Sequence, residues 1–105
     1  MDGTGVYKWA DGTFYEGSWQ KGKMHGQGTF KLGDGRQYIG NFVNDKKEGY
    51  GEYFWADGRA YKGQWVAGKQ HGTGTFVKST GKEKQGRWEN GKRVAWLEEE
   101  EEEDE

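Results

Sequence analysis

The chain repeats itself every 23 residues, and this repeat constrains its fold more than any other feature. The full units are 15–37, 38–60 and 61–83. Residues 84–97 form a decayed copy, and residues 3–14 match the second half of one further unit. Repeats of this length are typical of arrays in which each unit packs against its neighbours. The sequence therefore predicts a repeat array over residues 1–97, with an acidic tail at 98–105.

Glycine occupies fixed positions in this repeat. Of the 20 glycines, 19 fall at five repeat sites. One site holds Gly17, Gly40, Gly63 and Gly86, and a second holds Gly5, Gly28, Gly51 and Gly74. Flexible linkers are also rich in glycine, but the same chain carries six tryptophans. The glycines are therefore interpreted as structural positions.

Aromatic rings recur with the glycines. Hydrophobic residues make up only 30% of the chain, and 17 residues are Phe, Trp or Tyr. Each such side chain can bury ~150–250 Å², so burial is expected to come from rings. The first ring of a unit is Tyr15, Tyr38 or Tyr61, and the ring four residues later is Trp19, Phe42, Trp65 or Trp88.

Alternation of residue types predicts β-strands. Tyr-x-Gly-x-Trp has a period of two, which places Tyr, Gly and Trp on one strand face. Asp-Gly pairs such as Asp34-Gly35 separate the halves of each unit and indicate hairpin turns. The prediction is an all-β fold: about eight strands of ~6 residues in one antiparallel meander. Strand glycines are expected to leave room for a ring from an adjacent strand, with Tyr38 lying over Gly28 or Gly51.

The pattern Tyr-x-Gly-x-Trp-x-x-Gly-Lys-x-His-Gly-x-Gly resembles the MORN repeat (membrane occupation and recognition nexus). Residues 15–28 and 61–74 fit it in full, and residues 38–51 fit it with three replacements. Residues 84–97 depart furthest, and we interpret this last unit as a cap that folds over the final edge. The resemblance implies an elongated, twisted single sheet of stacked 23-residue hairpins. It also implies a scaffold of cytoskeletal, ciliary or membrane-junction assemblies.

The sequence offers little for catalysis. His25 and His71 lie two units apart, ~19 Å on stacked hairpins, so one metal ion cannot join them. We expect both to be structural, through ring packing or a turn hydrogen bond. The Gly-Gln-Gly and Gly-Thr-Gly segments lack the strand–loop–helix context of a phosphate-binding loop. There is no cysteine. We therefore expect no enzyme activity, no cofactor and no metal.

The ring face is the first candidate binding surface, because exposed aromatic area often marks a partner site. The candidate residues are Tyr15, Trp19, Tyr38, Phe42, Tyr61, Trp65 and Trp88. Trp9, Phe54 and Trp55 are expected to extend this surface, and Tyr50 is a second candidate contact on the opposite face. The alternative interpretation is that these rings serve folding only.

Charge gives a second candidate surface. The net charge of −2 hides a basic body and a tail of eight acidic residues. One lysine per unit follows the return turn, which predicts an anion-binding row of Lys23, Lys46, Lys69 and Lys92. The same row also fits turn chemistry, solubility and protection of the sheet edge. The acidic tail is a candidate competitor for this row.

These features favour a non-enzymatic scaffold that binds a helix or extended segment of another protein. The alternative is a peripheral membrane module that recognises acidic phospholipids or phosphoinositides. A regulatory fragment of a larger enzyme is a third possibility. A homo-oligomer stays open, and nucleic acid is not expected as a partner. No signal peptide or membrane span is recognisable, which favours a cytoplasmic location.

Overall fold

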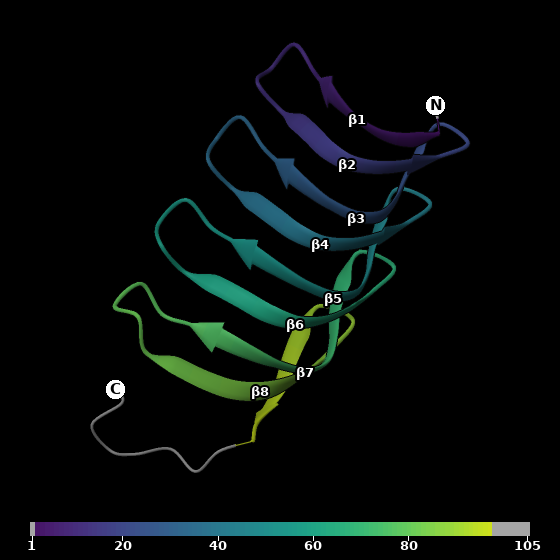
Figure 1. Cartoon of the computed structure of the whole chain (residues 1–105). Coiled ribbons are helices and arrows are strands. Elements are labelled where there is room, and N and C mark those ends of the chain that lie inside the picture. The colour runs from purple at the N-terminus through teal and green to yellow at the C-terminus, as the bar shows by residue number, and fades with distance from the viewer. Residues whose placement is uncertain (1, 98–105) are drawn as a thin grey trace.

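The computed structural model describes residues 2–97 and shows one open sheet of nine strands in chain order (Figure 1). The strands are β1 (Gly3–Lys8), β2 (Phe14–Gln20), β3 (Lys23–Lys31), β4 (Gln37–Val43), β5 (Lys46–Phe54), β6 (Ala60–Val66), β7 (Lys69–Val77), β8 (Glu83–Glu89) and β9 (Lys92–Trp96). The predicted acidic tail at 98–105 lies outside the described residues.

The predicted all-β meander is confirmed. Every strand pairs antiparallel with the next one along the chain, so the hairpins stack into an elongated body of 50 × 24 × 17 Å. Figure 1 shows the strands as curved ribbons stacked along one axis, with turns on both sides. The strand count is nine rather than about eight. The additional strand is β9, which comes from the decayed last unit.

Two classes of turn connect the strands. The return turns, such as Ala67-Gly68, have two residues with positive φ, here 52° and 88°. Turns of this kind match the twist of the strands that they connect. The Asp-Gly turns are longer: Leu32 and Arg36 close a loop in which Gly35 has a φ of 101°. The Asp34 carboxylate accepts a hydrogen bond from the Arg36 amide at 3.1 Å and stabilises this loop.

A bulge bends the odd-numbered strands β3, β5 and β7. In β5 the register slips between the pairs Gly40–Gly51 and Phe42–Lys47, which leaves extra residues on β5. Gly49 lies in this stretch with a φ of 81°, a conformation that a side chain would strain. Bulges bend strands and increase their twist, in agreement with the curved ribbons of Figure 1.

A row of glycines crosses the sheet from β1 to β8, each paired with the next. Its members are Gly5, Gly17, Gly28, Gly40, Gly51, Gly63, Gly74 and Gly86. Tyr61 on β6 lies across this row: a β-carbon at Gly74 would stand only 2.5 Å from its Cε1. Tyr61 is fully buried, and its hydroxyl donates a hydrogen bond to the Gln64 carbonyl at 3.0 Å. The predicted space above the strand glycines is therefore present, and a tyrosine ring fills it.

The prediction that Tyr38 lies over Gly28 or Gly51 is confirmed for Gly51. Tyr38 covers Gly51, whereas Gly28 is covered by Tyr15 of the preceding unit. Each of the three buried tyrosines is on an even-numbered strand, and its ring extends towards the next strand along the chain. It therefore lies over the glycine of that odd-numbered strand. The tyrosine and the glycine that it covers thus belong to the same repeat unit.

The buried rings join the units edge to face. Tyr61 lies between Trp65 of its own unit at 5.3 Å and Trp88 of the next unit at 4.7 Å. Tyr15 and Tyr38 each contact two rings in the same way. Such pairs contribute about 0.5–1.5 kcal/mol beyond their buried area. The core is therefore a continuous line of rings along the array.

The last unit does not fold over the edge as the sequence suggested. Its residues form β9, which pairs with β8 and continues the sheet. Trp96 packs against Trp88 at 6.3 Å, and a β-carbon at Gly86 would stand 3.1 Å from Trp96 Cε3. The final unit has Lys84 where the others have tyrosine, and Trp96 supplies the ring that lies against the glycine row.

Candidate functional site

The seven rings predicted to bind a partner form the core of the protein. Their exposed fractions lie between 0 and 9%, because each ring is covered by its neighbours in the line. The residues are Tyr15, Trp19, Tyr38, Phe42, Tyr61, Trp65 and Trp88. Their folding role is visible, and they leave little surface for a partner. Recognition by these rings stays a prediction.

The accessible part of the ring face is a second layer of rings, which we define as Tyr7, Trp9, Phe30, Tyr53, Trp55 and Phe76. Phe30, Tyr53, Trp55 and Phe76 are partly buried and pack on the core. Tyr7 and Trp9 are 47% and 37% exposed, with their ring centres 4.6 Å apart. Tyr53 and Trp55 form the same kind of pair at 4.8 Å. This layer presents aromatic surface along the array.

The sequence contains a signal for this layer that the prediction missed. Trp9 and Trp55 are two units apart and occupy the same repeat site, which Leu32 and Lys78 fill in the other units. The expectation that both tryptophans extend the ring face does not make use of this shared site. Phe54 does not belong to this surface, because strand alternation places it on the opposite face from Tyr53.

Lys47 lies within the ring face. Its Nζ atom is 5.6 Å from the ring centre of Tyr38, 5.8 Å from that of Tyr53 and 5.3 Å from that of Trp65. Rings at such distances attract an ammonium group. Burial lowers the pKa of Lys47, and the positive charge of Arg36 lowers it further. Among residues 2–97 the ion pairs are Arg36–Asp34 and Arg59–Asp57, so no carboxylate there forms a salt bridge with Lys47.

A pocket of about 300 Å³ opens beside Lys47. It is lined by Lys47, Tyr53, Trp55, Trp65, Gly68, Lys69, Gln70 and Gly91. The site of Lys47 in the repeat holds Met24, Gln70 and Arg93 in the other units. Lys47 and Lys69 thus bring two amines to the aromatic walls of this pocket, whereas Arg93, at the site equivalent to Lys47 in the last unit, lies over the Trp96 ring at 4.5 Å.

The four lysines of the predicted row lie at equivalent positions along the sheet. Its four residues are exposed, and each begins an odd-numbered strand, so they follow one edge of the sheet at intervals of ~9.6 Å. The row consists of Lys23, Lys46, Lys69 and Lys92. Anion binding by this row stays a prediction. In the described part of the chain, no helix has the length and hydropathy needed to cross a bilayer.

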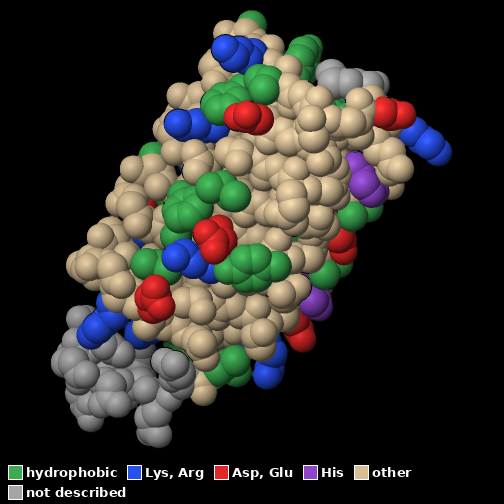
Figure 2. All heavy atoms as spheres, viewed as in Figure 1, with side chains coloured by type: hydrophobic (Ala, Val, Ile, Leu, Met, Phe, Trp, Pro, Cys, Tyr) green, Lys and Arg blue, Asp and Glu red, His purple; other side chains and the backbone are tan. Residues whose placement is uncertain are grey.

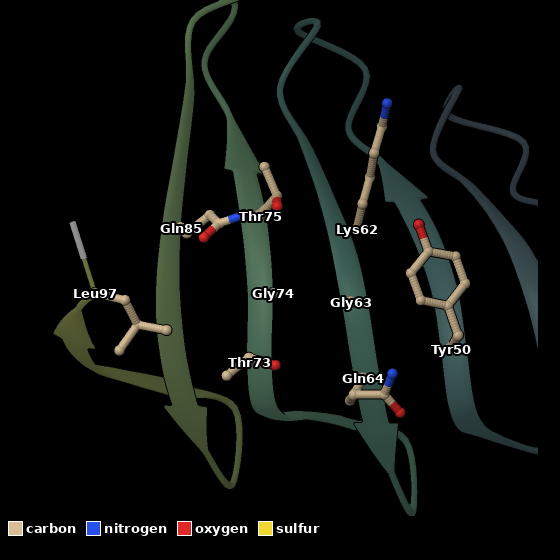
Figure 3. Close-up of a pocket in the computed structure, with 9 residues that line it drawn as sticks. All are labelled: Tyr50, Lys62, Gly63, Gln64, Thr73, Gly74, Thr75, Gln85 and Leu97. Carbon is tan, nitrogen blue, oxygen red and sulfur yellow. The ribbon is translucent and has the colours of Figure 1, made fainter.

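The polar face carries a second pocket, of about 370 Å³. Figure 3 shows Gly63 and Gly74 on its floor, with Tyr50 at one side and Leu97 at the other. Tyr50 is 52% exposed and donates a hydrogen bond to Glu52, so the predicted second contact does lie accessible on this face. In the view of Figure 2, hydrophobic, basic and acidic side chains are interspersed.

The histidines belong to a repeat site that contacts return turns. Asp2, His25, Glu48 and His71 share this site. Glu48 accepts a hydrogen bond from the Ala67 amide at 2.9 Å, and Asp2 accepts one from the Lys21 amide. Nδ1 of His25 is buried without a partner among residues 2–97. Within the same residues, no group of three His, Asp or Glu side chains has the arrangement of a metal site.

Comparison with known protein families agrees with this architecture. The family model of the MORN repeat matches residues 1–14, 15–35, 38–58, 61–83 and 85–94. These segments follow the repeat units and together cover most of the chain. A search of curated proteins finds no match. The match over most of the chain, together with the stacked hairpins that it covers, shows that this chain belongs to the MORN repeat family.

Proposed function

We propose that the chain is a non-enzymatic scaffold whose ring face binds a helix or extended segment of another protein. The second ring layer carries this proposal. It is the accessible aromatic surface of the ring face, and it runs in the direction in which the units stack. Aromatic side chains dominate the binding energy of many protein interfaces. The setting that we propose is cytoplasmic, in a cytoskeletal, ciliary or membrane-associated assembly.

The shape of the array supports a long and narrow partner segment. Tyr7 and Trp9 lie at the β1 end, whereas Tyr53 and Trp55 lie near the middle. Strands stand ~4.8 Å apart, so two such ring pairs, four strands apart, are separated by ~19 Å. A helix of ~13 residues spans this distance at 1.5 Å per residue.

The test is capture of partners from the source cell, read by mass spectrometry. The variant Trp9→Ala/Trp55→Ala removes two accessible rings and leaves the buried line of rings in place. Ile39→Ala is the control, because it shortens an exposed apolar side chain on the polar face. We expect the control to keep the partners of the wild type and the double variant to lose them, with the same circular dichroism. Equal capture by all three proteins would rule out the ring face.

A peripheral membrane module is the second candidate, and the exposed lysine row favours it. Lysines near an anionic bilayer contribute about 1 kcal/mol each. Flotation with phosphoinositide-containing vesicles tests this function at moderate salt. If the row is used, Lys23→Gln/Lys46→Gln/Lys69→Gln/Lys92→Gln should abolish flotation. Absence of binding by the wild type would discard the membrane function.

A further inference from the structure

The pocket beside Lys47 contains a partly desolvated ammonium group that no carboxylate of residues 2–97 pairs with. Burying an ammonium group costs free energy unless an opposite charge or another favourable contact compensates it. The three rings around Nζ supply partial compensation through their electron-rich faces. The carboxylates of Asp34 and Asp57 form ion pairs with Arg36 and Arg59. Among the described residues, the lining of the pocket therefore carries two lysines and no acidic side chain.

The pocket walls indicate which anion fits. Lys47 and Lys69 provide two amines, while Tyr53, Trp55 and Trp65 provide flat apolar surface. An anion entering here leaves water and meets an ammonium in a medium that strengthens their attraction. A group with an adjacent apolar part gains further by covering the rings. The chemistry therefore suits a single anionic group attached to an apolar one.

A peptide carboxylate fits better than the head group of a phosphoinositide. A phosphate group presents three strong acceptor oxygens and is commonly bound by forked arginine donors or several backbone amides. The lining of this pocket includes no arginine, and the Gly68 amide is already bonded to the Lys47 carbonyl at 2.9 Å. A carboxylate needs fewer donors and carries one charge, which matches the one partly buried ammonium, since Lys69 is exposed to water.

We propose that the Lys47 pocket binds an aspartate or glutamate side chain of the partner segment, with an apolar neighbour of that residue packed against Trp55. This inference rests on the proposed function, because it assigns the chemistry of the segment that the ring face receives. It predicts that the middle unit of the array binds an acidic residue through Lys47. The other units have Met24, Gln70 and Arg93 at the equivalent site.

The test is a selection of short random peptides displayed against the whole chain. Three proteins are compared: wild type, Lys47→Met and Lys62→Met. Methionine is chosen because Met24 occupies the same repeat site, so the fold should tolerate it. Lys62→Met changes the net charge equally but alters the polar face, where Lys62 lines the other pocket. Circular dichroism checks that all three are folded.

The wild type and Lys62→Met should select peptides with Asp or Glu beside an apolar residue, and Lys47→Met should not. A selected peptide should bind Lys47→Met about tenfold more weakly than the wild type, as expected for a charge-assisted contact. Replacing its acid by the matching amide should weaken binding to the wild type equally and to Lys47→Met much less. Selection without acidic enrichment, no selected peptide at all, or equal enrichment on Lys47→Met would overturn the proposal.

Two further measurements separate this inference from the proposed function. If proteins captured in the pull-down bind Lys47→Met as well as the wild type, the pocket is wrong and the scaffold stands. If the ring-face variants capture the same proteins as the wild type, the scaffold is wrong, while the peptide selection still decides the chemistry of the pocket. Lys47-dependent binding of phosphoinositide vesicles without acidic peptides would assign the pocket to lipid instead.

Discussion

At the scale of single residues, the fold depends on where side chains are missing. Gly74 gives the ring of Tyr61 a place against the backbone, and the same arrangement recurs in the two units before it. Gly63 is packed as tightly, because a β-carbon there would stand 2.6 Å from the Cα atom of Gly74. The glycine row is thus required by contact distances rather than by flexibility.

Ala67 is poorly suited to its backbone conformation. It has a φ of 52° in a return turn, where Asn44 and Asn90 adopt 50° and 51°. Alanine is strained in this region, and asparagine tolerates it. We expect Ala67→Asn to raise the free energy of unfolding by about 0.5–1 kcal/mol, measured by urea denaturation. Asn44→Ala should lower it by a similar amount, and no change in either variant would contradict this reading of the turn.

The structural roles of single residues were largely predictable, because each repeat site has the same steric requirement in every unit. The repeat itself identified the strand glycines and the tyrosines above them. Lys47 was not predictable in this way, because its site holds a different residue in every unit. Its pairing with Phe42 places it on the ring face, and the bulge in β5 that sets this pairing has no marker in the alternation of residue types.

At the scale of elements, hydrogen bonds link each hairpin to the next at the return turns. The Gly68 amide donates to the Lys47 carbonyl, and the Gly91 amide donates to the Gln70 carbonyl, both at 2.9 Å. Glu48 adds a side-chain link to the same turn through the Ala67 amide. Successive units are thus connected by more than strand pairing and ring contacts.

Removal of the Glu48 link should weaken the connection between two units. Glu48→Ala leaves the Ala67 amide without this acceptor, so we expect a loss of about 1 kcal/mol in the free energy of unfolding. Glu48→Gln keeps an acceptor oxygen and should lose less than half of that. Urea denaturation of both variants measures the difference. Equal stability of Glu48→Ala and the wild type would show that water replaces the link without cost.

Strands and turns were predictable from alternation and from Asp-Gly pairs, since these are local signals. The role of the repeat site shared by His25 and Glu48 was not predictable from local signals. The partner of Glu48, the Ala67 amide, lies 19 residues further along the chain. The last strand was also missed. Its ring, Trp96, does not follow the repeat, and only the pairing of β9 with β8 shows what it does.

At the scale of the whole molecule, the buried tyrosines should make the protein less stable at high pH. Burial raises the pKa of Tyr61 to about 12 and also raises the pKa of Tyr15 and Tyr38. In the unfolded chain a tyrosine ionises near pH 10, so above that pH the unfolded state binds fewer protons. The free energy of unfolding should therefore be unaffected by these groups below pH 10 and fall as pH rises from 10 towards 12.

The expected slope in that window is about 1.4 kcal/mol per pH unit for Tyr61, and the raised pKa values of Tyr15 and Tyr38 make it steeper. Urea denaturation at several pH values measures it, and phenolate absorbance reports the ionisation directly. Tyr61→Phe should remove the contribution of Tyr61 from this pH dependence of the free energy of unfolding. A flat profile up to pH 12, or ordinary ionisation of all six tyrosines in the folded protein, would contradict the burial of these rings.

The overall architecture was predictable because stacked identical units leave few alternatives. The accessible surface was harder to predict, since the first ring layer is covered by its own neighbours. Only the packing distinguishes buried Trp65, 6% exposed, from Trp9 at 37%. The accessible candidate surface therefore consists of the second ring layer and Lys47, because the regular rings are buried.

The most direct test of the fit between glycine and tyrosine is a double-mutant cycle at Gly74 and Tyr61. Alanine is normally better than glycine in a strand by about 0.5–1 kcal/mol. In the wild type, however, Gly74→Ala places a methyl group against the Tyr61 ring and should lower the free energy of unfolding by about 2–3 kcal/mol. In a Tyr61→Leu background that cost should fall by more than half. The same cost in both backgrounds would show that the glycine row does not exist to seat the rings.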